Sequence, residues 1–196
     1  GFTAACCIAS EGHTVIGVDV SDTKIADVNN CIAPFEEPGL QDLMEASFQA
    51  GRLTATKSVE DALLDADMAI VCVGTPSGID GAHDMRYIAD VSRQIATNVA
   101  RTSPEKMLTV VFRSTMRPGS IRKLVTPIFK ANIGENWSEK VTLIYNPEFL
   151  REAQAINDYF NPPKIVIGTV DGKPNAAMEA LNMNIHAQVF VTQYEE

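Results

Sequence analysis

Short apolar runs alternate with helix-like stretches along the whole chain. This alternation is typical of β-α units, in which parallel strands are covered by helices. The expected strands are the ranges 14–18, 68–73, 108–112, 141–144, 164–167 and 188–191. The chain is therefore predicted to be an α/β protein with a doubly wound parallel sheet.

Helices are expected between these strands. The clearest is the range 84–101, where apolar residues recur at the helical period and form one face that can cover the sheet. Gly12 is placed to end a first helix in a left-handed conformation. Ser58 with Asp61 resembles a capping box that opens a short helix. Further helices are expected at 2–10, 39–50 and within 175–196, where a last strand follows.

Composition narrows the class of protein. The 196 residues are 45% hydrophobic, enough for one good core, and no apolar run approaches the roughly 18 residues that a membrane span needs. With 16 basic and 25 acidic residues the net charge is −9, and no Lys/Arg cluster forms a stripe. We therefore expect a soluble protein with no membrane or nucleic-acid partner.

The four cysteines do not have the spacing of a metal site. Cys6 and Cys7 are adjacent, Cys31 lies in a loop-like stretch and Cys72 lies in an apolar run. We expect reduced, mostly buried thiols and no bound metal. Reduced thiols fit a cytoplasmic location, which is the prediction.

The two ends of the chain suggest an incomplete domain. Residue 1 is a glycine that leads directly into a helical run of small residues, and the last residues carry no closing signal. We expect that a preceding strand and its glycine turn are missing and that 1–196 is a partial cofactor-binding domain. In a doubly wound sheet the missing strand would leave a gap between the strands expected at 14–18 and 68–73.

An acidic residue ends the first expected strand. Asp19 lies 18 residues after Gly1, close to the spacing of about 20 between a phosphate-binding glycine turn and a ribose-binding acid in Rossmann-like folds. A carboxylate there accepts hydrogen bonds from both ribose hydroxyls and repels a 2′-phosphate, which favours NAD over NADP. Gly1 would be the third glycine of the turn. An ordinary helix cap near Ser21 remains an alternative explanation of Asp19.

Five motifs together carry a family resemblance. In chain order they are VIGVDVSDTK, EPGL, VCVGTPSGIDGAHD, FRSTMRPGS and NPEFLRE. In order and approximate spacing the chain resembles the UDP-glucose and GDP-mannose dehydrogenases. The resemblance implies an NAD-dependent oxidation of the C6 alcohol of a nucleotide sugar to a carboxylate, in two hydride transfers through a thiohemiacetal and a thioester on a cysteine.

The resemblance also implies what the chain lacks. The family's nucleophilic cysteine, and the Lys and Asn that polarise the substrate oxygen, belong to a later region, and none of the four cysteines here has the surrounding motif. We therefore expect residues 1–196 alone to be inactive. A full-length protein is expected to be a homodimer or a larger homo-oligomer.

By resemblance, residues at the expected strand ends contact NAD. Gly74 lets the backbone approach a ligand at the end of a buried strand, and the family's counterpart of Thr75 contacts NAD. Thr115 is expected to contact NAD and to orient a catalytic water. The expected cofactor-binding residues are Gly1, Asp19, Lys24, Thr75, Thr115 and Glu152.

The NPEFLRE motif is the most specific of the five. Glu148 and Glu152 are four residues apart and would share a face if the segment turned helically after its strand. The resemblance makes Glu148, with Thr115, a catalytic residue, with Glu148 acting as a base or water-positioning group in thioester hydrolysis. It places Glu152 near the nicotinamide and the sugar. The expected substrate-binding residues are Phe149, Leu150, Arg151 and Glu152.

The substrate and two other functions remain open. The Arg-Ser-Thr run followed by a Pro-Gly turn, and the segment 161–164, favour GDP-mannose oxidised to GDP-mannuronate, with UDP-glucose oxidised to UDP-glucuronate as the second choice. A non-catalytic NAD-binding regulatory module is the alternative function. A hydroxyacid or 6-phosphogluconate-type dehydrogenase would share the fold but not NPEFLRE, which argues against it.

Overall fold

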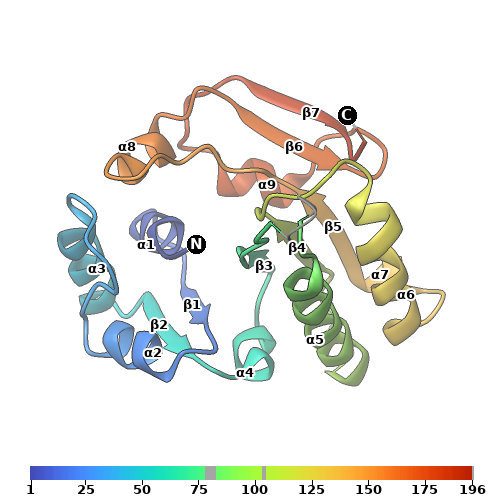
Figure 1. Ribbon diagram of the computed structural model, residues 1–196, viewed down its shortest axis with the longest axis horizontal. Helices are drawn as coiled ribbons and strands as arrows, with labels where there is room; N and C mark the ends of the chain where they lie inside the picture. Colours follow the sequence, from blue (N-terminus) through green and yellow to red (C-terminus); the bar gives the residue numbers. More distant parts are fainter. Residues whose placement is uncertain (78–82, 103–104, 196) are drawn as a thin grey trace. The chain divides into compact units, whose positions relative to one another are not determined.

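The computed structural model describes residues 1–77, 83–102 and 105–195 and has the α/β architecture expected (Figure 1). The chain forms two compact units. Unit 1 consists of Gly1–Ala62, Phe149–Pro163 and Asn184–Ala187, and unit 2 of Leu63–Glu148, Lys164–Met183 and Gln188–Glu196. No helix within the described ranges is long and apolar enough to cross a membrane.

Unit 1 is built around a two-stranded parallel sheet. Its elements are α1 (Phe2–Ser10), β1 (Val15–Val18), α2 (Asp22–Asn29), α3 (Leu40–Gln49), β2 (Leu53–Thr56) and α8 (Ala155–Phe160). All of α4 (Val59–Leu63) except Leu63 also belongs to unit 1. β1 pairs with β2 from Val15 opposite Leu53 to Val18 opposite Thr56. β2 was not expected, because Leu53 is its only fully buried residue and the run Leu-Thr-Ala-Thr has little apolar signal.

The core of unit 1 depends on the small side chains of α1. Its buried residues are Cys6, Ala9, Val28, Leu40, Met44 and Leu53. Small residues on one helix let neighbouring elements approach closely, so the run of Ala and Cys in α1 allows dense packing against α3 and β2. Phe2 adds an edge-on ring contact with Phe35 at 6.1 Å between centroids.

Unit 2 contains a five-stranded sheet in the order β3-β4-β5-β6-β7. The strands are β3 (Met68–Val71), β4 (Leu108–Phe112), β5 (Val141–Tyr145), β6 (Ile165–Thr169) and β7 (Val189–Gln193). The helices are α5 (Arg86–Thr102), a wider helical turn η1 (Ile121–Val125), α6 (Thr126–Ile133), α7 (Trp137–Lys140) and α9 (Ala176–Leu181). All five residues of β4 are buried, as expected for a central strand covered on both faces.

The sheet of unit 2 is mixed and not entirely parallel. β3, β4 and β5 are parallel, and so are β6 and β7, but β5 and β6 are antiparallel. The expected α/β fold with parallel strands is confirmed, but the antiparallel direction of the β5–β6 pair was not predicted. The reason is physical: apolar runs report burial but not strand direction.

The junction between β5 and β6 is narrow. It has one register pair, Tyr145 opposite Gly168, and a Cβ atom at Gly168 would lie 3.3 Å from Tyr145 Cβ. The buried Tyr194 hydroxyl donates a 2.7 Å hydrogen bond to the carbonyl of Leu143 on β5. Gly168 therefore allows the two strands to approach closely, and the Tyr194 hydroxyl adds a side-chain hydrogen bond beside the single register pair.

The six expected strands match β1 and β3 to β7 with shifts of at most two residues at either end. Ser58 accepts the N–H of Asp61 at 3.1 Å, as a helix cap does. Gly12 has φ of +103°, as expected at the end of α1. Residues 146–151 have no regular secondary structure, so the helical turn that would bring Glu148 and Glu152 to one face does not form.

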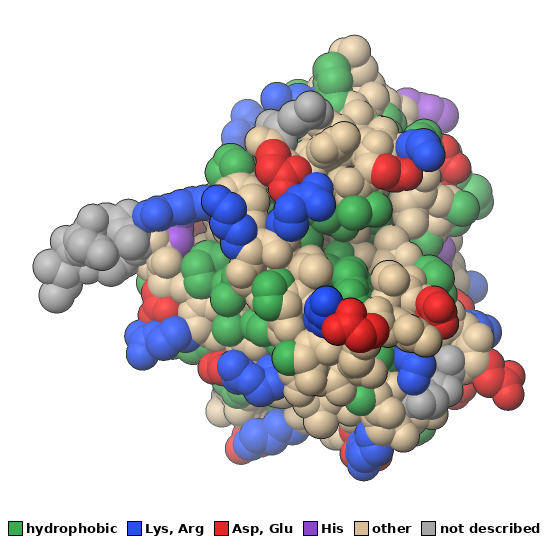
Figure 2. Space-filling model, turned by 90° about the vertical axis from the view of Figure 1, so that its right-hand side faces the viewer, with side chains coloured by type: hydrophobic (Ala, Val, Ile, Leu, Met, Phe, Trp, Pro, Cys, Tyr) green, Lys and Arg blue, Asp and Glu red, His purple; other side chains and the backbone are tan. Residues whose placement is uncertain are grey.

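Charged side chains of both signs are interspersed over the face of the molecule that Figure 2 presents. Several of them form ion pairs, such as Arg122 with Glu195 at 2.6 Å in unit 2. Exposed pairs of this kind contribute little to stability. The buried sheet and helix faces therefore stabilise the described fold more than its surface charges do.

Candidate functional site

Asp19 follows the last residue of β1 in unit 1. Its Oδ1 accepts the N–H of Ser21 at 2.9 Å, and Oδ2 lies 3.8 Å from Lys24 Nζ. The side chain is 42% exposed. Ser21, not Asp19, caps α2, because its hydroxyl accepts the N–H of Lys24 at 3.4 Å. The Asp19 carboxylate thus stabilises the turn with one oxygen and directs the other, beside a cation, toward solvent.

This arrangement fits the adenosine end of NAD. A carboxylate at the carboxyl end of a parallel strand is the group that accepts hydrogen bonds from ribose hydroxyls in such folds. Oδ2 of Asp19 has that acceptor capacity beside its ion-pair partner Lys24, which is also exposed. Gly1 takes the N-cap position of α1, and its carbonyl accepts the N–H of Ala5 at 3.0 Å.

In unit 2 the carboxyl ends of β3, β4 and β5 lie at one edge of the sheet, because these three strands are parallel. Hydrogen bonds continue past the strands. The Ser114 hydroxyl donates to the carbonyl of Val73 at 2.7 Å, and the Asn146 N–H donates to the carbonyl of Phe112 at 2.9 Å. The segments that carry Thr75, Thr115 and Glu148 are therefore tied to one another.

The two threonines differ in their surroundings. Thr115 is exposed and Thr75 is half-buried. The carbonyl of Thr75 lies 3.3 Å from Nδ1 of His83, and Ser77 forms an isolated antiparallel bridge with His83. The sequence around His83 has no partner pattern, so this contact was not predicted. The polar sequence 77–84 predicts a loop with Asp84 as a helix cap. Residues 78–82 lie outside the described residues, and Asp84 accepts the N–H of Arg86, the first residue of α5, at 3.0 Å.

Glu148 faces a buried arginine at the same edge. Glu148 Oε2 lies 3.9 Å from Arg113 Nε, and the two side chains are 32% and 12% exposed. Within the described residues Arg113 Nε is buried and makes no hydrogen bond. A buried guanidinium with an unsatisfied N–H favours an anion nearby. The Glu148 carboxylate is the ion-pair partner of this guanidinium, and sequence reasoning had assigned Arg113 no role.

Three cysteine thiols have a raised pKa. Burial and, to a smaller extent, the neighbouring Cys31 raise the pKa of Cys6 to about 12. Burial also raises the pKa of Cys72, with Arg113 lowering it and Glu148 raising it to smaller extents. The pKa of Cys31 is raised by desolvation and by Glu45. A thiol with a raised pKa is a poor nucleophile at neutral pH.

The end of the NPEFLRE segment lies in unit 1. The Arg151 backbone N–H and Nε both donate to Asp158 Oδ2, at 3.0 and 2.9 Å, and Nη2 donates to Oδ1 at 2.7 Å. The Arg151 guanidinium lowers the pKa of the Asp158 carboxyl to about 2. Phe149 and Glu152 are exposed. The Arg151 side chain is therefore engaged with α8, whereas those of Phe149 and Glu152 face solvent.

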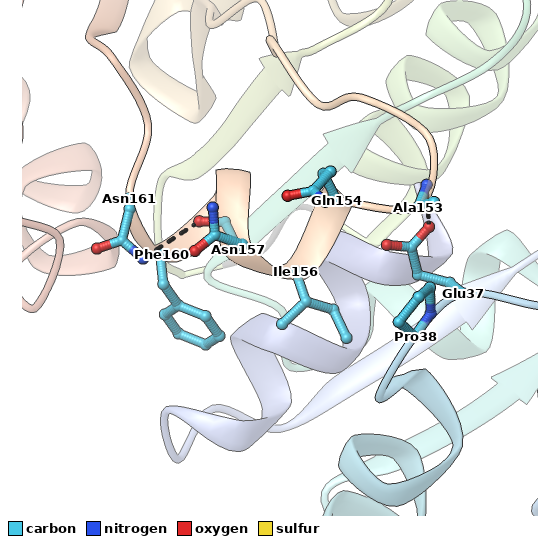
Figure 3. A pocket seen from close by; sticks show the side chains of 8 residues that line it. All are labelled: Glu37, Pro38, Ala153, Gln154, Ile156, Asn157, Phe160 and Asn161. Carbon is cyan, nitrogen blue, oxygen red and sulfur yellow. Dashed lines mark hydrogen bonds between the residues drawn. The ribbon is translucent and has the colours of Figure 1, made fainter.

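A shallow pocket of about 390 Å³ lies beside α8 (Figure 3). It is lined by Glu37, Pro38, Ala153, Gln154, Ile156, Asn157, Phe160 and Asn161. Figure 3 shows Glu37 and Pro38 on one side and the start of α8 on the other, with Glu37 hydrogen-bonded to Ala153. The EPGL motif and the segment after NPEFLRE, more than a hundred residues apart in the sequence, therefore meet in unit 1.

Comparison with known proteins decides the family. The model of the UDP-glucose/GDP-mannose dehydrogenase family, NAD binding domain, matches residues 1–186. The chain belongs to this family. The family's description includes NAD binding, which confirms the cofactor prediction at the level of the family, and its dehydrogenase class confirms the resemblance that the five motifs indicated.

Individual members of this dehydrogenase family are similar to the chain in sequence and in structure. The chain is 40% identical to a GDP-mannose 6-dehydrogenase of Pseudomonas aeruginosa over 96% of this chain and 43% of the relative. It is 32% identical to a UDP-glucose 6-dehydrogenase of Bacillus subtilis over 100% of this chain and 41% of the relative. The crystal structure of a ternary complex of the Pseudomonas aeruginosa GDP-mannose dehydrogenase superposes with a TM-score of 0.94, at 39% identity, over 100% of this chain and 44% of that one.

The chain thus spans less than half the length of these dehydrogenase relatives. Within that length, Asp19, Thr75, Thr115 and Glu148, predicted from strand ends and from the family resemblance, lie beyond the last residues of β1, β3, β4 and β5. Sequence reasoning assigned no role to Arg113 or to Glu37. Arg113 could have been noticed as a charged residue directly after an entirely buried strand, whereas the contacts of Glu37 are too distant in sequence to give a local signal.

Proposed function

We propose that this chain is the NAD-binding part of an oxidoreductase that oxidises the C6 alcohol of a nucleotide sugar to a carboxylate in two hydride transfers. The observation that carries the proposal is the family match over residues 1–186. When bound, NAD supplies the hydride acceptor. The residues of the chain then have to bind the cofactor, orient the sugar and move protons.

Unit 1 is proposed to hold the adenosine end of NAD. Asp19 Oδ2 accepts hydrogen bonds from the ribose hydroxyls, and its negative charge disfavours a 2′-phosphate. Lys24 lies 3.8 Å from that oxygen and supports the same end of the cofactor. Gly1, at the start of α1, is proposed to be the third glycine of the phosphate-binding turn, the one that allows the helix to pack closely on the sheet.

Unit 2 is proposed to supply Thr75 and Thr115 as further NAD contacts and Glu148 as the base or water-positioning group. The position of Glu148 beyond β5, with Oε2 3.9 Å from Arg113 Nε, supports this role, because the ion pair orients the carboxylate at the sheet edge. Thr115 is exposed directly beyond β4, where its hydroxyl can reach a water molecule. The raised thiol pKa values of Cys6, Cys31 and Cys72 give none of these residues a nucleophilic role.

The segment Phe149–Glu152 is proposed to bind the nucleotide sugar. Arg151 is held by Asp158, so its backbone, not its guanidinium, is the part proposed to contact the sugar. Leu150 contributes backbone groups in the same way. Glu152 is exposed and is proposed to lie near the sugar and the nicotinamide.

GDP-mannose is the proposed substrate, with GDP-mannuronate as the product. The higher identity to the GDP-mannose relative, 40% against 32% for the UDP-glucose relative, supports this choice. The test is NADH formation by the complete gene product that contains residues 1–196, with each sugar in turn. We expect a higher kcat/KM for GDP-mannose, and a higher value for UDP-glucose would contradict the substrate assignment.

The same assay separates a catalyst from a binding module. NAD binding with no NADH formed from any nucleotide sugar would indicate a non-catalytic regulatory module. We further propose that residues 1–196 alone form no NADH, that the complete gene product is a homodimer or larger homo-oligomer, and that it acts in the cytoplasm. The last proposal is supported by the four cysteines, all in the described ranges, none of which forms a disulfide.

A further inference from the structure

Glu37 makes two hydrogen bonds to a segment far away in the sequence. Its Oε2 accepts the N–H of Ala153 at 2.9 Å, and its Oε1 accepts the N–H of Ala155 at 2.8 Å. Ala155 is the first residue of α8, whose first N–H groups have no partner within the helix. One carboxylate thus satisfies two backbone donors across a sequence separation of 116 and 118 residues.

The position of Glu37 is fixed by the residues that follow it. Its carbonyl accepts the N–H of Leu40 at 3.0 Å, and Leu40 is buried at the start of α3. Gly39 has φ of +78°, a conformation that glycine adopts without strain. Ile156 on α8 packs against the core of unit 1. The carboxylate is therefore presented from a rigid turn to a helix that is itself anchored.

The turn that Glu37 binds is strained. Ala153 has φ of +60°, in the left-handed region that a residue with a Cβ atom rarely adopts. Such a conformation persists when its surroundings impose it. On one side of Ala153 the Arg151 N–H is held by Asp158, and on the other the Ala155 N–H is held by Glu37. The backbone between Arg151 and Ala155 is thus fixed by two carboxylates.

We propose that Glu37 is a positioning residue for the nucleotide sugar: by imposing the turn at Ala153 it sets the conformation of the adjoining segment Phe149–Glu152. The inference rests on the proposed function, in which this segment contacts the sugar. Glu37 itself touches neither substrate nor cofactor in this account. It acts through the backbone of the turn at Ala153. The EPGL motif would therefore position a segment more than a hundred residues away.

The test compares Glu37→Gln with Glu36→Gln in the complete gene product. Glutamine keeps one acceptor oxygen but turns an NH₂ group toward the second N–H, whereas Glu36 is exposed and its substitution makes the same charge change one residue away. The measurements are kcat, KM for GDP-mannose and the NAD dissociation constant. We expect Glu37→Gln to raise KM for GDP-mannose about ten-fold, the effect of losing a charge-assisted hydrogen bond, and to raise the NAD dissociation constant by a much smaller factor, because Glu152 is the one proposed NAD contact in the segment.

Glu37→Asp is the second variant, because it keeps both oxygens and retracts them by one methylene. We expect a smaller rise in KM than with Glu37→Gln, and this variant decides the question if Glu37→Gln does not fold. If the Glu37 variants had the same KM for GDP-mannose as Glu36→Gln, the inference would be overturned. It would also be overturned if they lost affinity for the sugar and for NAD by the same factor, and Glu37 would then be a structural residue. A wild-type protein that forms no NADH with any nucleotide sugar would instead overturn the proposed function and this inference with it.

Discussion

At the scale of single residues, carboxylates fix the backbone at three points of unit 1. Asp19 holds the turn before α2, Asp158 holds Arg151, and Glu37 holds the start of α8. Each accepts at least one backbone N–H, so its contribution depends on ionisation and on geometry. Two of the three lie in motifs found from sequence, but only the acceptor role of Asp19 could be derived from its position.

The Asp158 pair predicts a defined pH dependence of stability. The pKa of this carboxyl is about 2 in the folded chain, against 3.8 as the ordinary value. Because the folded pKa is the lower one, the stabilisation is fully present above about pH 4 and is lost as the pH falls toward 2. We expect Asp158→Asn to lower the melting temperature at pH 7 and to have progressively less effect below pH 4. An effect that stays constant down to about pH 2 would contradict the ion pair.

Asp19→Asn tests the ribose acceptor. Asparagine can still accept the N–H of Ser21 but has no charge, so we expect the NAD dissociation constant of the complete gene product to rise about ten-fold and the preference over NADP to narrow. Titration of NAD monitored by protein fluorescence measures this. Asp22→Asn is the control, because Asp22 is also exposed and pairs with Lys57 on the surface. Equal NAD affinity in the two variants would contradict the role of Asp19.

At the scale of helices and strands, apolar pattern predicted most positions but not their directions. The range 108–112 was predicted with the bounds of β4 because every residue in it is buried. β2 was missed because polar threonines alternate with small apolar residues on a strand with one buried side chain. The antiparallel junction of β5 and β6 was missed because strand direction depends on how the chain crosses over, which burial does not encode.

In the candidate site, too, the sequence pattern predicted positions along the chain but not the contacts between distant segments. Residues directly after a strand, such as Asp19 and Thr115, could be placed at the sheet edge from the pattern alone. Glu148 and Glu152 could not be placed correctly, because the segment between them is held in a non-helical conformation by Asp158 and by Glu37, the latter more than a hundred residues away. The local sequence indicates only the local spacing of residues, whereas the hydrogen bonds to Asp158 and Glu37 determine the backbone conformation of this segment.

Tyr194→Phe tests the narrow junction in unit 2. Removing the hydroxyl leaves the Leu143 carbonyl without its 2.7 Å donor, so we expect the free energy of unfolding to fall by about 1–2 kcal/mol. Chemical denaturation measures it. Tyr87→Phe is the matched control, because Tyr87 is exposed on α5. If both variants were equally stable, the hydroxyl would not contribute to the junction.

At the scale of the whole molecule, family membership connects the two units to one activity. Unit 1 carries Asp19 and the segment Phe149–Glu152, and unit 2 carries Thr75, Thr115 and Glu148. The chain spans 43% of a GDP-mannose 6-dehydrogenase relative, so the complete reaction is proposed for the complete gene product.

The measurement that tests the central claim most directly is the stoichiometry of the reaction. The complete gene product is incubated with a limiting amount of GDP-mannose and excess NAD, and the NADH formed is compared with the sugar consumed. Two successive hydride transfers predict two NADH for each GDP-mannose and a carboxylate product. One NADH for each sugar with an aldehyde as the product, or no NADH at all, would contradict the account.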